Sequence, residues 1–215
     1  FGTGLNFMAT WKAWLESGAK GTLTFISVEK YPLSSNALAE AHKTFPDLAP
    51  YSKELCNAWP PPAPGLHPRN FANGKIKLFL LFGDAADAFS ELNATVDAWY
   101  FDGFAPAKNP EMWTDELFNQ IAQLSRPGTS FATFTAAGFV RRALQARGFH
   151  VDKVKGYGRK RERLVGYLDH SPLCTPSHQP RLPEWATPPV IGKTSSTLII
   201  GAGIAGSSLA TALSE

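Results

Sequence analysis

The sequence has only two cysteines among its 215 residues, Cys56 and Cys174. Two thiols are too few for a disulfide scaffold, and the five histidines show no spacing that would add a metal site to them. No apolar run reaches the length of about 18 residues that indicates a transmembrane helix. Internal repeats and low-complexity segments are also absent. These absences exclude disulfide-rich, zinc-finger, membrane-spanning and repeat proteins, so we expect no metal ion and no membrane partner.

The composition is that of a folded, globular protein. Hydrophobic residues make up 44% of the chain and charged residues 18%, which is enough to bury a core. The chain begins with Phe1 rather than Met, and no signal-peptide pattern follows. It also ends soon after a new motif begins at Thr197. We therefore interpret it as an internal fragment of a longer protein, which we expect to be cytoplasmic and monomeric.

Positive charge is concentrated in one part of the chain. Residues 139–163 carry nine basic and two acidic side chains, whereas the whole chain has a net charge of only +3. A segregated basic block is typical of proteins that bind a phosphate-rich partner such as RNA. The alternative is an ordinary solvated face, and charge alone does not decide between the two.

Hydrophobic periodicity alternates between helix and strand along residues 1–169. The pattern predicts helices at 5–15, 34–45, 85–92, 110–124 and 139–147. It predicts strands at 22–28, 75–82, 97–101, 129–135, 149–155 and 164–168, with a proline-rich loop at 60–68. This alternation is typical of an α/β fold with a mostly parallel sheet and helices on both faces. The last two strands are expected to form an antiparallel edge.

A proline-rich segment interrupts this pattern after residue 169. Residues 170–195 contain six prolines and are predicted to form a semi-extended linker. A strand from Thr197 then leads into a glycine turn and a helix, the context of a dinucleotide-binding turn. The sequence therefore predicts a first domain at 1–169, a linker at 170–195 and the start of a second nucleotide-binding domain at 196–215. The glycines of that second turn are Gly201, Gly203 and Gly206.

A glycine turn also opens the first domain. Gly2 and Gly4 flank Thr3 directly before the first predicted helix, where glycines let the backbone approach a ligand. Glu29 ends the next strand, where a carboxylate can accept hydrogen bonds from ribose hydroxyls. The alternative is a plain turn and a solvent-facing glutamate.

A second acid follows a strand in the sequence Gly83-Asp84-Ala85. Ligands of open α/β sheets bind at the carboxyl ends of strands, and Asp84 could hydrogen-bond an adenine amino group there. The alternative is that Asp84 only caps the helix predicted at 85–92.

The densest motif is YFDGFAPAKNPEMW, residues 100–113. Asp102 ends a strand and begins a loop that two prolines and several aromatic residues stiffen. Asn109 and Pro110 are then suited to cap and start a helix. A stiff loop indicates a preorganised pocket, and rigid rings suit stacking on an unstacked base. The alternative is that Asp102 only caps its own loop.

Four stretches together resemble the methyltransferase half of the MnmC family of bifunctional tRNA-modifying enzymes. They are FGTGLNF (1–7), DGFAPAKNPEMW (102–113), TFTAAGFVRRALQARGF (133–149) and GYGRKRE (156–162). The resemblance covers 1–169, and 196–215 resembles the start of the family's flavin-dependent oxidoreductase half. The family's first strand, with its glycine and acid, is expected to precede Phe1.

The resemblance implies a class I, Rossmann-like methyltransferase. Its cofactor would be S-adenosylmethionine, and its substrate the exocyclic amine of 5-aminomethyl-2-thiouridine at the tRNA wobble position. The oxidoreductase half would use FAD, bound at Gly201, Gly203 and Gly206, to convert the carboxymethylaminomethyl precursor into that amine. No metal is needed, because an acid beside the donor methyl can accept an amine hydrogen and orient the nitrogen lone pair.

The resemblance also assigns residues to each role. Asp102 and Phe104 would be catalytic. The residues expected to bind S-adenosylmethionine are Gly2, Thr3, Gly4, Glu29, Lys30, Asp84, Ala85 and Asp102. The basic residues expected to contact RNA are Arg141, Arg142, Lys155, Arg159, Lys160, Arg161 and Arg163.

Two other function classes stay open at this point. One is an FAD- or NAD-dependent oxidoreductase in which 1–169 is an accessory RNA-binding module. The other is a non-catalytic RNA-binding module that uses the basic block. Binding of S-adenosylmethionine separates the methyltransferase from both.

Overall fold

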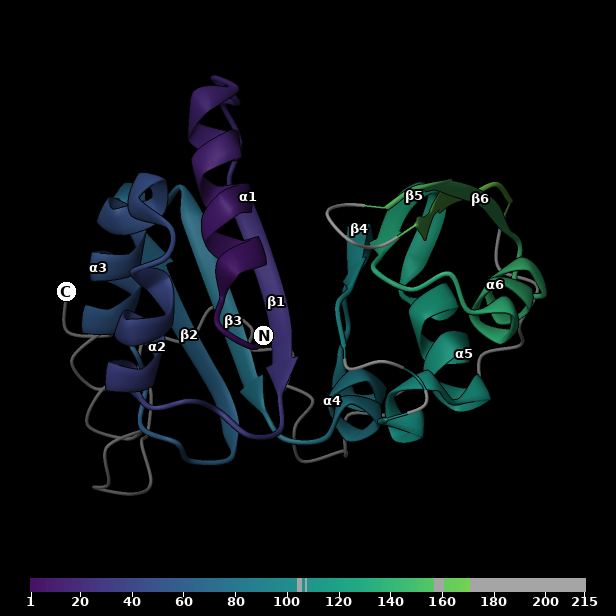
Figure 1. Cartoon of the computed structure of the whole chain (residues 1–215), viewed down its shortest axis with the longest axis horizontal. Helices are drawn as coiled ribbons and strands as arrows, with labels where there is room; N and C mark the ends of the chain where they lie inside the picture. The colour runs from purple at the N-terminus through teal and green to yellow at the C-terminus, as the bar shows by residue number, and fades with distance from the viewer. Residues whose placement is uncertain (104–105, 107, 157–160, 171–215) are drawn as a thin grey trace, which may run out of the picture. The chain divides into compact units, whose positions relative to one another are not determined.

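The structure, a computed structural model, describes residues 1–103, 106, 108–156 and 161–170. Figure 1 shows their helices and strands. The helices are α1 (Leu5–Glu16), α2 (Ser35–His42), α3 (Ala49–Asn57), α4 (Ala85–Glu91), α5 (Asp115–Gln123) and α6 (Gly138–Gln145). The strands are β1 (Leu23–Glu29), β2 (Gly65–Phe71), β3 (Ile76–Phe82), β4 (Val96–Phe101), β5 (Ser125–Thr133), β6 (Phe149–Lys155) and β7 (Glu162–Leu168). Short 3-10 turns lie at Pro46–Leu48 (η1), Ala72–Gly74 (η2) and Pro110–Trp113 (η3).

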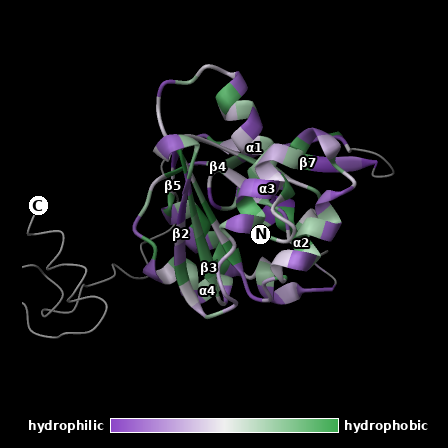
Figure 2. Cartoon of the chain, turned by 90° about the vertical axis from the view of Figure 1, so that its left-hand side faces the viewer, coloured by the Kyte–Doolittle hydropathy of each residue, from purple (hydrophilic) through white to green (hydrophobic). Residues whose placement is uncertain are grey.

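The first sheet has the strand order β1-β3-β2. β1 is parallel to β3, and β2 is antiparallel to β3 on the other side. Every second residue of β3 is buried, from Ile76 to Phe82, and these side chains meet Phe7 and Trp11 of α1 and Leu55 of α3. Figure 2 shows this hydrophobic character along β3. The core therefore holds α1 and its N-terminal turn against the sheet.

The second sheet has the strand order β4-β5-β7-β6. β4 and β5 are parallel, whereas β7 is antiparallel to both of its neighbours. Its core contains Phe118 and Ile121 of α5, Val140 and Leu144 of α6, and Phe131 of β5. This core fixes the carboxyl end of β4, where Asp102 follows Phe101.

The structure confirms the α/β class and the antiparallel pairing of the last two strands. Fewer of the strand pairs are parallel than predicted: among the described pairs, two are parallel and three are antiparallel. The described residues also form two sheets, and no described ladder joins β1 to β4. The single, mostly parallel sheet of the sequence analysis thus differs from the observed pairing.

Part of that difference comes from the proline-rich segment. Residues 60–68 were expected to form a loop, but Gly65–Phe71 is strand β2. Pro68 lies in it opposite Phe79, at the edge of its sheet, where a missing N–H does not interrupt a ladder. The helix α3 was also missed, since Pro50 in its first turn was not recognised as a helix start.

The segment after the YFDGFAPAKNPEMW motif also differs from the prediction. Asn109 makes no capping hydrogen bond through its side chain, and only the 3-10 turn η3 follows it. The α-helix begins at Asp115, and Thr114 caps it by accepting a hydrogen bond from the Leu117 N–H. Thr114 followed by Asp115 and Glu116 is a stronger signal for a helix start than Asn109 followed by Pro110. Acidic residues in the first turn interact favourably with the helix dipole.

The described residues contain neither a helix that could span a membrane nor a cluster that could hold a metal ion. None of the helices in this part of the chain is both long and apolar enough to cross a membrane. Its His, Cys, Asp and Glu side chains also form no cluster of three or more that could hold a metal ion.

Candidate active site

The glycine turn before α1 has the backbone geometry that its sequence predicts. Gly2 and Gly4 have φ angles of +60° and +73°, in the left-handed region that favours glycine. A Cβ on Gly4 would lie 2.7 Å from the Phe1 ring, whereas a Cβ on Gly2 would have no atom within 4 Å. Gly4 is therefore required by packing, and the backbone at Gly2 is open to a ligand.

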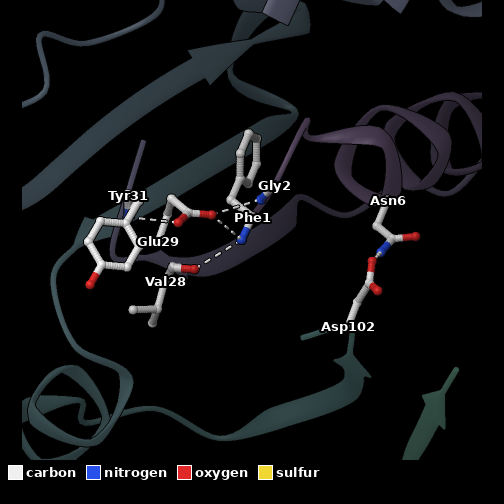
Figure 3. A network of polar contacts seen from close by, with 7 residues as sticks. All are labelled: Phe1, Gly2, Asn6, Val28, Glu29, Tyr31 and Asp102. Atoms are coloured by element: carbon white, nitrogen blue, oxygen red, sulfur yellow. Dashed lines mark hydrogen bonds and ion pairs between the residues drawn. The ribbon is translucent and has the colours of Figure 1, made fainter. Parts of the chain in front are cut away.

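Glu29 holds this turn from the end of β1. Its carboxylate accepts hydrogen bonds from the Gly2 N–H at 2.9 Å and the Tyr31 N–H at 2.8 Å (Figure 3). Burial raises the pKa of Glu29, but the hydrogen bonds from the Gly2 and Tyr31 N–H groups lower it, and the pKa lies below its ordinary value. Glu29 is thus an ionised side chain that contacts the glycine turn, rather than a residue that only faces solvent.

Asp84 follows β3, the parallel neighbour of β1, so the two acids lie at the same edge of the sheet. Its Oδ1 accepts a hydrogen bond from the Ala86 N–H at 3.0 Å and so caps α4, which begins at Ala85. Its Oδ2 accepts a hydrogen bond from Lys30 Nζ at 3.1 Å. The Ala86 bond and then Lys30 lower the pKa of Asp84. Asp84 therefore caps α4 as well as pairing with Lys30, and its place along the cofactor stays a prediction.

Asp102 lies directly after β4, and its side chain is exposed. Asn6, in the first turn of α1, donates a hydrogen bond of 2.6 Å from Nδ2 to Asp102 Oδ2. Figure 3 shows the two side chains pointing toward each other. One turn further along α1, the Thr10 hydroxyl lies 3.0 Å from that of Tyr100, the residue two before Asp102. α1 is therefore fixed to the end of β4 by two polar contacts.

The start of α1 connects the two candidate acids of the site. Gly2 contacts Glu29 of the first sheet, and Asn6, four residues later, contacts Asp102 of the second. The structure thus brings the glycine turn, Glu29, the Lys30–Asp84 pair and Asp102 to the carboxyl ends of strands, where α/β folds bind ligands. Six further predicted site residues lie outside the described part of the chain: Phe104, Arg159, Lys160, Gly201, Gly203 and Gly206.

The remaining basic residues of 139–163 do not form one uniform group. Arg142, Lys155 and Arg161 are exposed, and Arg141 and Arg163 are half-buried. Ala132 of β5 pairs with Val165 of β7, so residues 161–163 lie further toward the carboxyl end of β5. α6, which carries Arg141 and Arg142, begins from that same end. These side chains therefore lie at the edge of the sheet that also bears Asp102.

Arg147 has a structural role instead. It is 9% exposed, donates hydrogen bonds to Asn119, Ala143 and Asp115, and lies over the Phe118 ring. A guanidinium with this many partners is part of the core rather than a free contact for RNA.

The sequence analysis missed two residues of this region. Asn6 lies in the first turn of α1, and no local sequence signal indicated its contact with Asp102. His42 falls four residues after Leu38 on the buried face of α2, and this spacing was the only signal for it.

Comparisons with known proteins agree with this geometry. The S-adenosyl-L-methionine-dependent methyltransferase family matches residues 46–169. The chain belongs to this family. Its cofactor is S-adenosylmethionine, which confirms the prediction from the resemblance.

The relatives are bifunctional proteins. The chain is 52% identical, over 99% of its length, to the tRNA 5-methylaminomethyl-2-thiouridine biosynthesis bifunctional protein MnmC of Magnetococcus marinus. It is 46% identical over its whole length to the MnmC protein of Marinomonas sp., and it covers 32% of each relative. The chain thus spans about a third of the length of the curated relatives it matches.

A solved structure gives the same assignment. The crystal structure of MnmC2 from Aquifex aeolicus superposes with a TM-score of 0.62 at 26% identity. The match covers 78% of this chain and 51% of that chain. The methyltransferase fold is therefore supported by backbone geometry as well as by sequence.

The residues present fit the cofactor of the family. A carboxylate oxygen can accept about two hydrogen bonds, and Oε1 of Glu29 has one described partner, the Tyr31 N–H. It can therefore also accept a hydrogen bond from a ribose hydroxyl. The open backbone at Gly2 allows a ligand to approach next to it.

Proposed function

We propose that the chain is the methyltransferase part of a tRNA-modifying enzyme and methylates the amine of 5-aminomethyl-2-thiouridine. The observation that carries this proposal is Asp102, placed at the end of β4 by Asn6 of the helix that follows the glycine turn. An acid next to a cofactor-binding turn suits transfer to an amine. The names of the relatives support the tRNA substrate.

The chemistry requires a neutral amine. A free alkylamine is mostly protonated near neutral pH, since the reference pKa of lysine is about 10.4. When bound, S-adenosylmethionine would supply a methyl group on a positively charged sulfur, and the electron pair of the S–C bond would stay on that sulfur as the amine nitrogen takes the methyl group. The nitrogen then loses a proton to an acceptor or to solvent.

The proposed role of Asp102 is to accept a hydrogen from the substrate amine and to orient its lone pair. The carboxylate is exposed and fixed on one oxygen by Asn6, so its remaining lone pairs can accept this hydrogen. Phe104 is proposed to lie near the transferred methyl group. Gly2, Thr3, Gly4, Glu29, Lys30, Asp84 and Ala85 are proposed to line the cofactor.

The basic edge is proposed to bind the tRNA backbone. Arg142, Lys155 and Arg161 have exposed side chains, and Arg141 and Arg163 are partly accessible beside them. Arg159 and Lys160 are proposed to belong to the same surface. Phosphate contacts from such residues would hold the anticodon stem while the wobble base reaches Asp102.

The domain layout stays a prediction. We propose a methyltransferase domain at 1–169, a linker at 170–195 and the beginning of an FAD-dependent oxidoreductase domain at 196–215. The expectation that a first strand precedes Phe1, the cytoplasmic location and the monomeric state also stay predictions.

Methyl transfer can be tested directly. The chain is incubated with S-adenosylmethionine carrying a labelled methyl group and with tRNA that contains 5-aminomethyl-2-thiouridine. We expect label in the wobble nucleoside. The control is the same tRNA with an unmodified wobble uridine, which lacks the amine. If the chain binds the cofactor but labels both tRNAs equally or neither, the proposed substrate is wrong.

A further inference from the structure

His42 is a buried polar side chain that the proposed chemistry does not use. It is the last residue of α2 and is only 4% exposed. Its Nε2 lies 2.6 Å from the carbonyl oxygen of Thr3, and its Nδ1 lies 2.7 Å from the Ser52 hydroxyl of α3. The imidazole therefore connects two helices with the middle residue of the glycine turn.

The partners determine where the ring carries a hydrogen. A backbone carbonyl only accepts hydrogen bonds, so Nε2 must carry a hydrogen and donate it to Thr3. In the neutral ring, Nδ1 then accepts a hydrogen bond from the Ser52 hydroxyl. Both ring nitrogens are thus satisfied inside the protein, as a buried polar group requires.

The position of the Thr3 carbonyl matters because of its neighbours. Gly2 and Gly4 both have positive φ angles, and glycine restricts the backbone less than any other residue. A turn of this kind needs contacts from outside to hold one conformation. Glu29 supplies one such contact at the Gly2 N–H, and His42 supplies another at the carbonyl of the next residue.

We infer that His42 is a positioning residue for cofactor binding. By fixing the Thr3 carbonyl, it sets the peptide planes of the glycine turn and so the direction of the open backbone at Gly2. It acts through the turn and does not touch the cofactor. This inference rests on the proposed function, because it assumes that the turn binds the cofactor of the family.

Two substitutions separate this role from simple core packing. The side-chain amide of Gln reaches to about the place of Nε2 and can still donate to Thr3. The amide of Asn reaches only to about the place of Nδ1, next to Ser52. A role in packing alone would make the two variants lose thermal stability without a selective change in cofactor affinity.

The experiment measures binding of S-adenosylhomocysteine to the chain by calorimetry, together with the melting temperature. We expect His42→Asn to weaken binding about tenfold, the effect of one buried hydrogen bond. We expect His42→Gln to stay within about threefold of the wild type. Ser52→Ala, which keeps the Thr3 contact, is the matched control and should also bind nearly normally. Equal losses in all three variants, or normal binding by His42→Asn, would overturn the inference.

Amide exchange distinguishes this inference from the proposed function. The Gly4 N–H donates a hydrogen bond to the Phe1 carbonyl across the turn, at 3.0 Å. Its exchange should be faster in His42→Asn than in His42→Gln, with or without a ligand. If the wild-type chain does not bind S-adenosylhomocysteine, the proposed function fails, and this comparison still decides the role of His42.

A measurement on the unmodified chain covers the case in which neither His42 variant folds. Nitrogen NMR should find the His42 ring hydrogen on Nε2, protected from exchange with solvent. A hydrogen on Nδ1 alone would contradict the contact with Thr3 and overturn the inference.

Discussion

Asn6 donates a hydrogen bond of 2.6 Å to the carboxylate of Asp102, 96 residues later in the chain. A hydrogen bond to a charged acceptor is stronger than one between neutral groups. This hydrogen bond also restricts the Asp102 carboxylate to one preferred orientation. The helix that carries the glycine turn therefore also aims the acid proposed to receive the substrate amine.

Removing the Asn6 amide should affect the rate of methyl transfer more than cofactor binding. In Asn6→Ala, Asp102 loses this hydrogen bond and its carboxylate can rotate. We expect the single-turnover rate to fall about tenfold, because a small misplacement of a reacting group costs at least this much. The affinity for S-adenosylhomocysteine should stay within about threefold.

The control for this prediction is Asn93→Ala, at an exposed position between α4 and β4. It should have a normal rate and normal affinity. If Asn6→Ala also keeps its normal rate, the hydrogen bond does not position Asp102 for catalysis.

Glu29 predicts a dependence of stability on pH. Because the pKa of Glu29 in the folded chain is lowered from its ordinary value of 4.5, its ionised form stabilises the fold above that pH. This stabilisation should be lost as the pH falls through the lowered pKa. The free energy of unfolding of Glu29→Gln should therefore be lower than that of the wild type at pH 7, and the two should converge in acid.

Denaturant unfolding at a series of pH values measures this difference. The matched control is Glu91→Gln, at an exposed position at the end of α4, which should follow the wild type throughout. A difference between Glu29→Gln and the wild type that stays constant down to acid pH would show that ionised Glu29 does not hold the glycine turn.

The sequence predicted the main elements of the fold because their signals are local. The buried run of β3 and the paired strands β6 and β7 follow from hydrophobic patterns within about seven residues each. β2 was missed because Pro68 is unfavourable in most strands, and only its edge position makes it acceptable. That position depends on β3, which a local pattern does not include.

The candidate site was also predictable only where its features are local in the sequence. Glu29, Asp84 and Asp102 each end a strand, which is a local feature. Their partners are not local, since Lys30 lies 54 residues from Asp84 in the chain, and Asn6 lies 96 residues from Asp102. Arg147 shows the converse case. Its charge placed it in the basic block, but its contacts with α5 are visible only in the fold.

The exposed basic residues should give tRNA binding its dependence on salt. Each phosphate contact contributes about 0.7–0.9 to the slope of log affinity against log salt concentration. In the double variant Arg142→Ala/Arg161→Ala, we expect weaker tRNA binding and a slope that is flatter by about 1.5. Filter binding or fluorescence anisotropy over a range of salt concentrations measures both quantities.

The matched control is Lys20→Ala/Lys75→Ala, which also removes two exposed positive charges. These two lysines lie where β1 and β3 begin, at the opposite ends of the strands from Glu29 and Asp84. If the two double variants change the slope equally, the basic edge does not form the tRNA contact.

Asp102 should be the most sensitive single position for methyl transfer. Asn at this position keeps the shape of the side chain and an oxygen that can accept from Asn6, but it removes the charge. Groups that orient a nucleophile or accept its proton typically contribute about 10²–10⁴-fold to the rate. We therefore expect Asp102→Asn to lower the single-turnover rate at least tenfold, with normal cofactor affinity and a normal melting temperature.

Raising the pH should restore part of the rate of Asp102→Asn, because more of the amine is then neutral without help from the protein. Asp97→Asn, at an exposed position near the start of β4, is the control and should have a normal rate. A near-normal rate in a folded Asp102→Asn chain would mean that Asp102 does not act on the substrate amine, and its role would then be limited to the contact with Asn6.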